Sequence, residues 1–373
     1  MNIFLVALIA YLCGPFAHGQ VDQSKSGGTL HTRRYFYAGG SYVKQGSSEI
    51  AHGQMYVEHL VPAKVTKDLP ILFIHGNGMT GTNFLNTPDG RTGWADYFMS
   101  QGYEVYLVDQ TTRARSVWQN GIDGNLLTFD TYTIESRFTA TQRYNLWPQA
   151  VLHTRWPGNG SVGDETFDAF YSTVMPSLAS AVEAAELMKA AGSKLIDEIG
   201  PLIILTHSQS GYIGWILGDS RPKNVKAIVA IEPNGPPFQE AIFSTTPARA
   251  YGLTDIPISF TPPISSAADL HPVAVSDISA QNYTCFQQSS PARQLTNLVD
   301  IPVLVVTSES GYHAVYDECS VQFLVEGGVN TTHIRLQDLG IHGNGHMMFM
   351  ETNSLEIADG VVQQWLSETL VFH

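Results

Sequence analysis

A serine-containing turn between two apolar segments constrains the fold of this chain more than any other feature. Residues 201–205 read Pro-Leu-Ile-Ile-Leu, residues 206–211 read Thr-His-Ser-Gln-Ser-Gly, and the apolar segment 212–217 follows. An apolar run, small residues around a serine and a second apolar segment predict a strand, a sharp turn and a helix. This arrangement is a nucleophile elbow, and it makes Ser208 the candidate nucleophile.

The elbow requires small side chains two positions before and two positions after the serine, because the backbone there is strained. Thr206 and Ser210 meet this requirement. If Ser210 were the nucleophile, Tyr212 would occupy a position that tolerates no bulk, so Ser208 is favoured. The alternative interpretation is a serine-rich turn without chemistry, and the remainder of the chain has to decide between the two.

The length and charge of the chain exclude some classes of partner. Its 373 residues suffice for one large or two smaller domains, and its formal net charge is -14. A field of this sign opposes binding to nucleic acid or to an anionic membrane, and no basic stripe is visible. We therefore expect neither partner. The sequence gives no indication of an oligomeric state.

The first residues resemble a secretory leader. Residues 3–12 are apolar but too few to cross a bilayer comfortably, and small residues follow as far as Gly19. The pattern predicts a signal peptide over residues 1–19 and a secreted mature chain over residues 20–373, although the positive n-region is missing. An N-terminal anchor is the alternative, and no later segment is long and apolar enough to span a membrane.

The cysteines and the glycosylation sequons are also consistent with a secreted protein. Loss of residues 1–19 would leave Cys285 and Cys319 as the only cysteines, and in an oxidising compartment they are expected to form a disulfide. Three sequons predict N-glycosylation if the source is eukaryotic. Their asparagines are Asn159, Asn282 and Asn330.

Short apolar runs alternate with helical stretches along most of the chain, which predicts an α/β fold. We expect a doubly wound, mostly parallel sheet in one domain, preceded by two antiparallel strands. The antiparallel strands are expected at 34–43 and 54–61, the parallel strands at 69–75, 103–109, 201–206, 225–231, 301–307 and 332–336, and two of the helices at 177–190 and 355–370.

Two long segments interrupt this alternation, at about 111–176 and 233–300. Long irregular insertions in a compact domain are usually functional, and the aromatic residues of the first favour an ordered cap over the carboxyl ends of the strands. The second is rich in Pro, Ser and Thr and contains Cys285. We expect the caps to form a partly aromatic pocket, for which Trp147, His153 and Trp156 are candidates.

A serine nucleophile needs a base, and a loop histidine between the last strand and the last helix is well placed to reach it. His346 in Asn-Gly-His-Met-Met is the candidate base, and His342 is the reserve. The spacing of these two histidines would also suit a metal on a helix, but Gly343 and Gly345 argue against a helix and no third ligand is near. We expect no metal.

The oxyanion hole is expected to combine the backbone N–H of Gln209, directly after the nucleophile, with one from the turn after an earlier strand. That turn reads His-Gly-Asn-Gly over 75–78, so the second donor is Asn77 or Gly78. The same turn matches G-x-G-x-x-G after a strand, which makes a dinucleotide-binding unit the rival interpretation. The interruption at 86–90, where a helix should continue, weakens the rival.

Two carboxylates are candidates for the acid that orients the histidine. Glu232 ends the strand at 225–231 and enters a proline-rich turn, and Glu309 follows the next strand. Geometry alone does not choose between them. The prolines give Glu232 a fixed backbone and therefore favour it.

The His-Gly-Asn-Gly turn, the Ser208 elbow, Glu232 and the Gly-Asn-Gly-His346 loop, in this order, resemble the α/β-hydrolase superfamily over nearly the whole mature chain. The variants Thr-His-Ser-Gln-Ser-Gly and Ile-Glu-Pro-Asn-Gly-Pro-Pro are most similar to a branch of secreted bacterial and fungal esterases whose acid is a glutamate at the position of Glu232.

The resemblance implies hydrolysis of a small-molecule carboxylic ester or lactone through a Ser-His-Glu triad, without a cofactor. An acyltransferase or a C–C hydrolase would use the same triad, and a non-catalytic binding protein could share the fold.

Overall fold

The structure is a computed structural model that describes residues 27–275 and 283–370. The predicted signal peptide over residues 1–19 and the sequon at Asn282 lie outside these residues. Within the described ranges, no helix combines the length and the apolar character that crossing a membrane requires.

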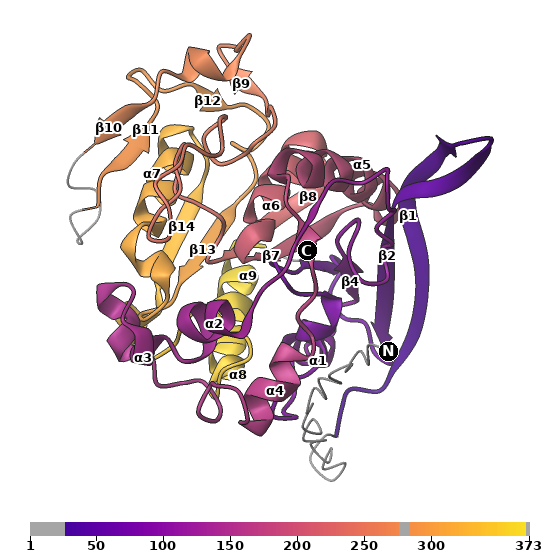
Figure 1. Ribbon diagram of the computed structural model, residues 1–373, viewed down its shortest axis with the longest axis vertical. Helices are drawn as coiled ribbons and strands as arrows, with labels where there is room; N and C mark the ends of the chain where they lie inside the picture. Colours follow the sequence, from indigo (N-terminus) through magenta and orange to yellow (C-terminus); the bar gives the residue numbers. More distant parts are fainter. Residues whose placement is uncertain (1–26, 276–282, 371–373) are drawn as a thin grey trace, which may run out of the picture.

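A central eight-stranded sheet organises the chain (Figure 1). The first two strands in its order run antiparallel to their neighbours, and the remaining six are parallel to one another. This is the predicted doubly wound α/β-hydrolase sheet with two leading antiparallel strands. In spatial order the strands are β1 (His31–Gln45), β2 (Ser48–Pro62), β4 (Val105–Asp109), β3 (Ile71–Ile74), β7 (Leu202–His207), β8 (Val225–Ile231), β13 (Val303–Thr307) and β14 (Thr331–Arg335).

The central strands are apolar on both faces because helices cover both sides of the sheet. In β3, Leu72 and Ile74 pack into one core and Ile71 and Phe73 into the other. The first core also receives buried side chains of α5 (Ala181–Ile199), α6 (Gly211–Ser220) and α7 (Asp317–Glu326), and the second those of α1 (Trp94–Ser100), α8 (Ser354–Ile357) and α9 (Gln364–Thr369).

The predicted helix at 177–190 is placed wrongly at its start. Ser177 and Leu178 form a short strand, and α5 begins only after Ser180, whose side chain accepts a hydrogen bond from the N–H of Glu183. Such an N-cap satisfies one of the free amides of the first turn and sets the helix start. Val182, in the first turn of α5, is 51% exposed, whereas Met188 is buried.

The last helical stretch contains a π-helical segment, Ala358–Gln363, between α8 and α9. Two apolar rows of this stretch, at i, i+4 spacing, are nonetheless buried against the sheet. The rows consist of Ile357, Val361 and Trp365, and of Ala358, Val362 and Leu366.

A glycine-rich bend divides the long hairpin of β1 and β2. Gly39 and Gly40 have positive φ angles of 67° and 80°, and a Cβ atom on Gly40 would lie 2.8 Å from the backbone nitrogen of Gln54. Only glycine tolerates both the conformation and the close approach. The hairpin can therefore bend there, and its tip projects beyond the sheet in Figure 1.

Where the structure describes them, the two segments that interrupt the alternation contain only short elements. The first holds α2 (Thr131–Ile134), α3 (Thr141–Tyr144), α4 (Glu165–Tyr171), β5 (Leu126–Leu127) and β6 (Ser177–Leu178) within or at the end of 111–178. The second holds β9 (Phe260–Thr261), β10 (Val273–Val275), β11 (Cys285–Gln287) and β12 (Gln294–Leu295), which lie at the upper end of the molecule near α7 in Figure 1.

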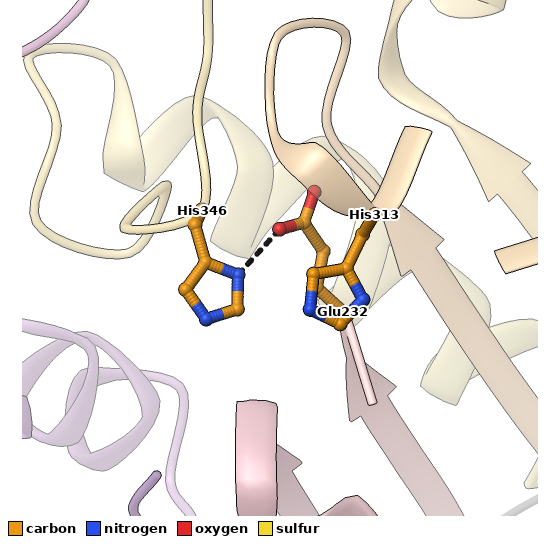
Figure 2. A group of neighbouring side chains, drawn as sticks. All are labelled: Glu232, His313 and His346. Atoms are coloured by element: carbon orange, nitrogen blue, oxygen red, sulfur yellow. Dashed lines mark hydrogen bonds and ion pairs between the residues drawn. The ribbon is translucent and has the colours of Figure 1, made fainter. Parts of the chain in front are cut away.

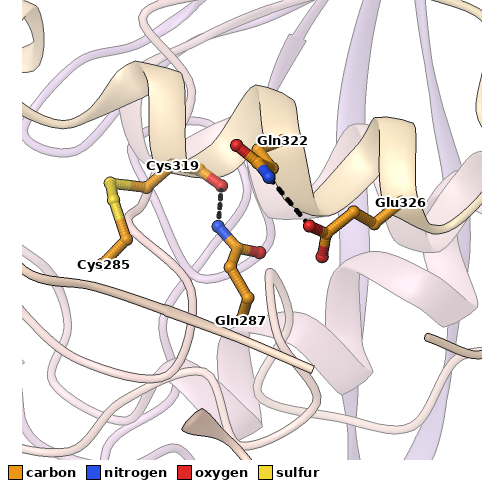
Figure 3. The surroundings of a disulfide bond; sticks show 5 residues. All are labelled: Cys285, Gln287, Cys319, Gln322 and Glu326. Atoms are coloured by element: carbon orange, nitrogen blue, oxygen red, sulfur yellow. Dashed lines mark hydrogen bonds between the residues drawn. A yellow bond between two sulfur atoms is a disulfide. The ribbon is translucent and has the colours of Figure 1, made fainter. Parts of the chain in front are cut away.

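A disulfide between Cys285 and Cys319 joins β11 to α7, as the sequence predicts. Figure 3 shows the pair beside Gln287, whose side chain donates a hydrogen bond of 2.8 Å to the carbonyl of Cys319. Both cysteines are fully buried. The disulfide and this hydrogen bond thus fix the second irregular segment to the scaffold.

Replacing both cysteines by alanine should lower the free energy of unfolding by about 3–4 kcal/mol, because the bridge closes a loop with a sequence separation of 34. Urea denaturation of the double variant and of the oxidised wild type would measure the difference. A change below about 1 kcal/mol would show that the bridge does not limit the unfolded chain in this way.

Candidate active site

Ser208 sits in the sharp turn between β7 and α6 with a φ of 58°, a left-handed conformation that is costly for a residue with a side chain. Ser210 stabilises this turn. Its Oγ donates 2.6 Å to the carbonyl of Ile74 and accepts 2.9 Å from the N–H of His207. The Ser210 hydroxyl is therefore occupied by backbone groups, whereas Ser208 presents its hydroxyl to another side chain.

Ser208, His346 and Glu232 form one continuous line of hydrogen bonds. His346 Nε2 lies 2.8 Å from Ser208 Oγ, and His346 Nδ1 lies 2.6 Å from Glu232 Oε2. Figure 2 shows the second of these contacts, with Glu232, directly after β8, and His346, in the loop before α8, pointing toward each other. Both side chains are fully buried. The structure thus brings together the three residues that the sequence predicts.

The other carboxylate candidate lies elsewhere. Glu309 Oε1 is 2.9 Å from His342 Nδ1, and Glu309 Oε2 accepts 2.7 Å from the N–H of Gly343. Glu232, by contrast, turns its second oxygen to Ser308, from whose N–H it accepts at 2.8 Å and whose hydroxyl also donates to it. Glu309 therefore fastens the histidine loop, and only Glu232 reaches His346.

Several buried residues that were not identified from the sequence hold this loop in place. His207 Nε2 donates 2.9 Å to the carbonyl of His346, so the residue before the nucleophile also positions the base. Ser310 Oγ donates 2.6 Å to the carbonyl of Asn344. Glu351 accepts from the N–H of Gly345 at 3.0 Å. The contacts of His207 and Ser310 join residues distant in sequence, so no local pattern could have indicated their roles.

A third histidine lies against the candidate base. The rings of His313 and His346 are stacked, with centroids 4.8 Å apart and planes 5° from parallel (Figure 2). His313 Nδ1 lies 2.9 Å from Asp317 Oδ1, and its Nε2 lies 3.2 Å from the Tyr316 hydroxyl. Burial raises the pKa of Asp317. This second pair of histidine and aspartate therefore packs beside the candidate triad.

In the part of the chain that the structure describes, Glu232, His313 and His346 form one group whose ligand atoms lie within 4.8 Å of one another. A metal ion bound by His346 would have to displace a hydrogen bond of that ring, because Nε2 contacts Ser208 and Nδ1 contacts Glu232. The metal pair considered from the sequence does not form, because His342 bonds Glu309 while His346 bonds Glu232.

Four aromatic side chains form a connected group beside the candidate base, and we name this group the aromatic wall. The ring of Phe138 stacks on His346 at 5.2 Å, and the hydroxyl of Tyr312 is 3.3 Å from His346 Nε2. Tyr312 in turn contacts Trp147 and Phe243, with centroids 5.8 and 5.1 Å away. The wall therefore combines residues of both irregular segments with a residue that follows β13.

Two of the three residues that the sequence predicts to line a pocket lie elsewhere in the structure. His153 is buried and pairs with Glu351 at 2.7 Å, and Trp156 packs on Phe170 in the second core. Only Trp147 belongs to the aromatic wall. The sequence pattern could not separate aromatic residues that face a pocket from those that fill a core, because both are apolar.

The turn after β3 lies directly against the candidate nucleophile. A Cβ atom on Gly76 would be 2.7 Å from Ser208 Cβ, so this position excludes a side chain. The N–H of Gly78 donates 3.1 Å to Ser177 Oγ and is thereby occupied. Among residues 27–275 and 283–370, no acceptor takes the N–H of Asn77.

The dinucleotide interpretation of this turn does not fit the structure. Only a four-residue 3-10 helix, Gly81–Phe84, follows the glycines, where a dinucleotide site needs the start of a full helix. Asp109, at the end of β4, where such a site would place its ribose-binding carboxylate, is fully buried and pairs with Arg115 at 2.6 Å.

Burial lowers the pKa of three histidines at the site. The pKa of His75 falls to about 3, mainly through burial and then through the charge of Arg113. Burial and the neighbouring His346 lower the pKa of His207, and burial and the neighbouring His313 lower that of His346. The ring of His346 is therefore neutral at neutral pH, as a proton acceptor must be.

Comparison with known proteins places the chain among ester hydrolases. No protein-family model matches it. It is 47% identical over 335 residues to "Probable secreted lipase phiG" of Fungal sp. (strain ATCC 74256), and the match covers 90% of this chain and 89% of the relative. A solved structure described as a novel bacterial esterase matches with a TM-score of 0.63 at 22% identity, over 92% of this chain and 98% of that one, and supports the fold.

The lowered pKa of His346 predicts a pH profile. Protonation of the imidazole prevents it from accepting a proton, so kcat/KM should fall with falling pH only below the ordinary histidine value of 6.5. Rates of ester hydrolysis from about pH 4 to 8 would locate the acid limb. A fall in kcat/KM with a midpoint above pH 6.5 would contradict the prediction.

Proposed function

The chain belongs to the α/β-hydrolase superfamily, with a probable secreted fungal lipase as a relative, and on this basis we propose that it hydrolyses its ester substrates through Ser208, His346 and Glu232. It is a carboxylic ester hydrolase. The residues that perform the reaction, and the acyl-enzyme route, are the proposal. The observation that carries the proposal is the unbroken line of hydrogen bonds from Ser208 Oγ through His346 to Glu232.

In the first half of the reaction, Ser208 Oγ attacks the ester carbonyl while its proton passes to His346 Nε2. The imidazolium that forms is stabilised by the carboxylate of Glu232. The tetrahedral intermediate then collapses, the bond to the alcohol oxygen breaks, and His346 returns the proton to the leaving alcohol. The product of this half is an acyl ester of Ser208.

In the second half, water attacks the acyl-enzyme and His346 accepts its proton. Collapse of the second intermediate releases the carboxylic acid and returns the proton to Ser208. In both halves the oxyanion accepts hydrogen bonds from the backbone N–H groups of Gln209 and Asn77. Asn77 is chosen over Gly78 because the Gly78 N–H already donates to Ser177.

The aromatic wall supports an apolar ester or lactone as the substrate. Phe138 and Tyr312 are half-buried beside His346, so they can contact an acyl or alcohol group held at Ser208. In this proposal the segments 111–176 and 233–300 are caps that select the substrate, since they contribute Phe138, Trp147 and Phe243.

We include export and glycosylation in the proposal. The relative is named as a probable secreted lipase, the chain carries a disulfide, and a signal peptide is predicted over residues 1–19. Asn159 and Asn330 are exposed, as acceptors of a glycan must be. Sequencing the amino terminus of the protein from a eukaryotic culture medium would test the cleavage site.

Ser208→Ala should lower kcat by about 10⁴- to 10⁶-fold, because it removes the attacking oxygen. Ser210→Ala is the matched control. It should keep kcat within about 10-fold and lower stability by about 1–3 kcal/mol, because it leaves buried backbone groups unpaired. Kinetics with a chromogenic ester and urea denaturation would measure both. The reverse pattern would assign the nucleophile to Ser210.

Glu232→Gln should lower kcat by about 10³- to 10⁴-fold with little change in KM, because an amide neither stabilises the imidazolium nor fixes its tautomer. Glu309→Gln, the control, should change kcat by less than about 10-fold, since Glu309 forms its hydrogen bonds with His342 and Gly343 of the histidine loop. A crippling effect of Glu309→Gln together with an active Glu232→Gln would assign the acid to Glu309.

A further inference from the structure

Arg113 is a buried cation whose role the proposed triad does not explain. It lies shortly after β4, and only 4% of its surface is exposed. Among the residues that the structure describes, no carboxylate forms an ion pair with it, and its Nε has no hydrogen-bond partner. Nearby Arg115, by contrast, pairs with both Asp109 and Glu58.

A buried charge without a counterion is expensive, so its hydrogen bonds have to account for its presence. Arg113 Nη1 donates 2.8 Å to the carbonyl of Gly76, and its Nη2 lies 3.4 Å from the side-chain oxygen of Asn77. Both acceptors belong to the turn that lies against Ser208. The guanidinium therefore binds both the backbone and a side chain of the turn at 75–78.

A second donor reaches the same carbonyl. His75 Nε2 accepts 3.0 Å from the backbone N–H of Gln110, and its pKa of about 3 keeps the ring neutral, so the proton is on Nδ1. His75 Nδ1 then donates 2.9 Å to the carbonyl of Gly76. The Gly76 carbonyl is thus held by Arg113 and His75 together.

The peptide between Gly76 and Asn77 is trans, so its carbonyl and its N–H point in opposite directions. Holding the carbonyl on the side of Arg113 keeps the N–H of Asn77 on the other side, where no described residue accepts it. A cationic donor on the carbonyl also polarises the peptide and strengthens its N–H as a donor.

From these contacts we infer that Arg113 is a positioning residue of the oxyanion hole: it fixes the Gly76–Asn77 peptide and increases the donor strength of the Asn77 N–H. The inference rests on the proposed function, in which that N–H binds the oxyanion. Arg113 acts through the peptide and does not touch the substrate. Its contribution should appear in the transition state and not in ground-state binding.

The test compares Arg113→Met, which removes charge and donors at similar length, with Arg113→Lys, which keeps the charge. Arg115→Met is the matched control, because it removes a nearby arginine that does not contact the turn. The measurements are kcat and KM for a chromogenic ester, the inhibition constant of an alkyl boronic acid that forms a tetrahedral adduct with a serine, and the thermal midpoint.

Arg113→Met should lower kcat by about 10- to 100-fold and raise the inhibition constant of the boronic acid by a similar factor. KM should stay within about 3-fold of the wild-type value. Arg113→Lys should recover part of both losses. Arg115→Met should lower the thermal midpoint and leave kcat and boronic acid affinity within about 3-fold. A general loss of packing would not produce this parallel change in kcat and boronic acid affinity.

Wild-type kcat and boronic acid affinity in folded Arg113→Met would overturn the inference, as would a rise in KM with kcat unchanged. If Arg113→Met does not fold, Arg113→Gln, which keeps an N–H donor without charge, takes its place, and wild-type values in that variant overturn the inference. The Ser208→Ala variant distinguishes a failure of the proposed function from a failure of the role proposed for Arg113. Turnover by Ser208→Ala would refute the proposed function, whereas an inactive Ser208→Ala with a fully active Arg113→Met would refute the role of Arg113 alone.

Discussion

The buried carboxylate of Glu232 is the constraint around which the site is built. A carboxylate without solvent is tolerated only when donors satisfy its oxygens. Here the donors come from Ser308 after β13 and from His346 before α8. Burying one side chain at the end of β8 therefore draws the ends of neighbouring segments to a single point. The contacts that satisfy the carboxylate are the same contacts that place the imidazole beside Ser208.

The parallel sheet supplies the rigidity that this arrangement requires. Both Ser208 and Glu232 have left-handed backbone conformations, with φ angles of 58° and 43°, and each directly follows a buried strand. Such conformations cost about 1–2 kcal/mol each and persist where the surrounding structure holds them. The strands β7 and β8 pair along their length, so the two strained residues are fixed relative to each other before any substrate arrives.

Local patterns in the sequence predicted the strands, the elbow and the histidine loop, because each is encoded by adjacent residues. The predicted strand at 225–231 has the same bounds as β8. The sequence did not determine which carboxylate orients His346, because two carboxylates follow neighbouring strands. The path of the loop after β14 decides which of them contacts the imidazole. Arg113 and His313 were missed for a related reason. Their partners are backbone groups or residues distant in the sequence, and a sequence motif does not indicate such contacts.

The bent hairpin at the edge of the sheet has a consequence for the solubility of the protein. Within the described part of the chain, no strand pairs with the outer edge of β1 along its 15 residues, and an open edge of this length is a template for pairing with another chain. The bend at Gly39 and Gly40 interrupts the flat register that such pairing needs, and Arg33, Arg34 and Lys44 add charge along the same strand. The glycines that shape the hairpin thereby also protect the protein from edge-to-edge aggregation.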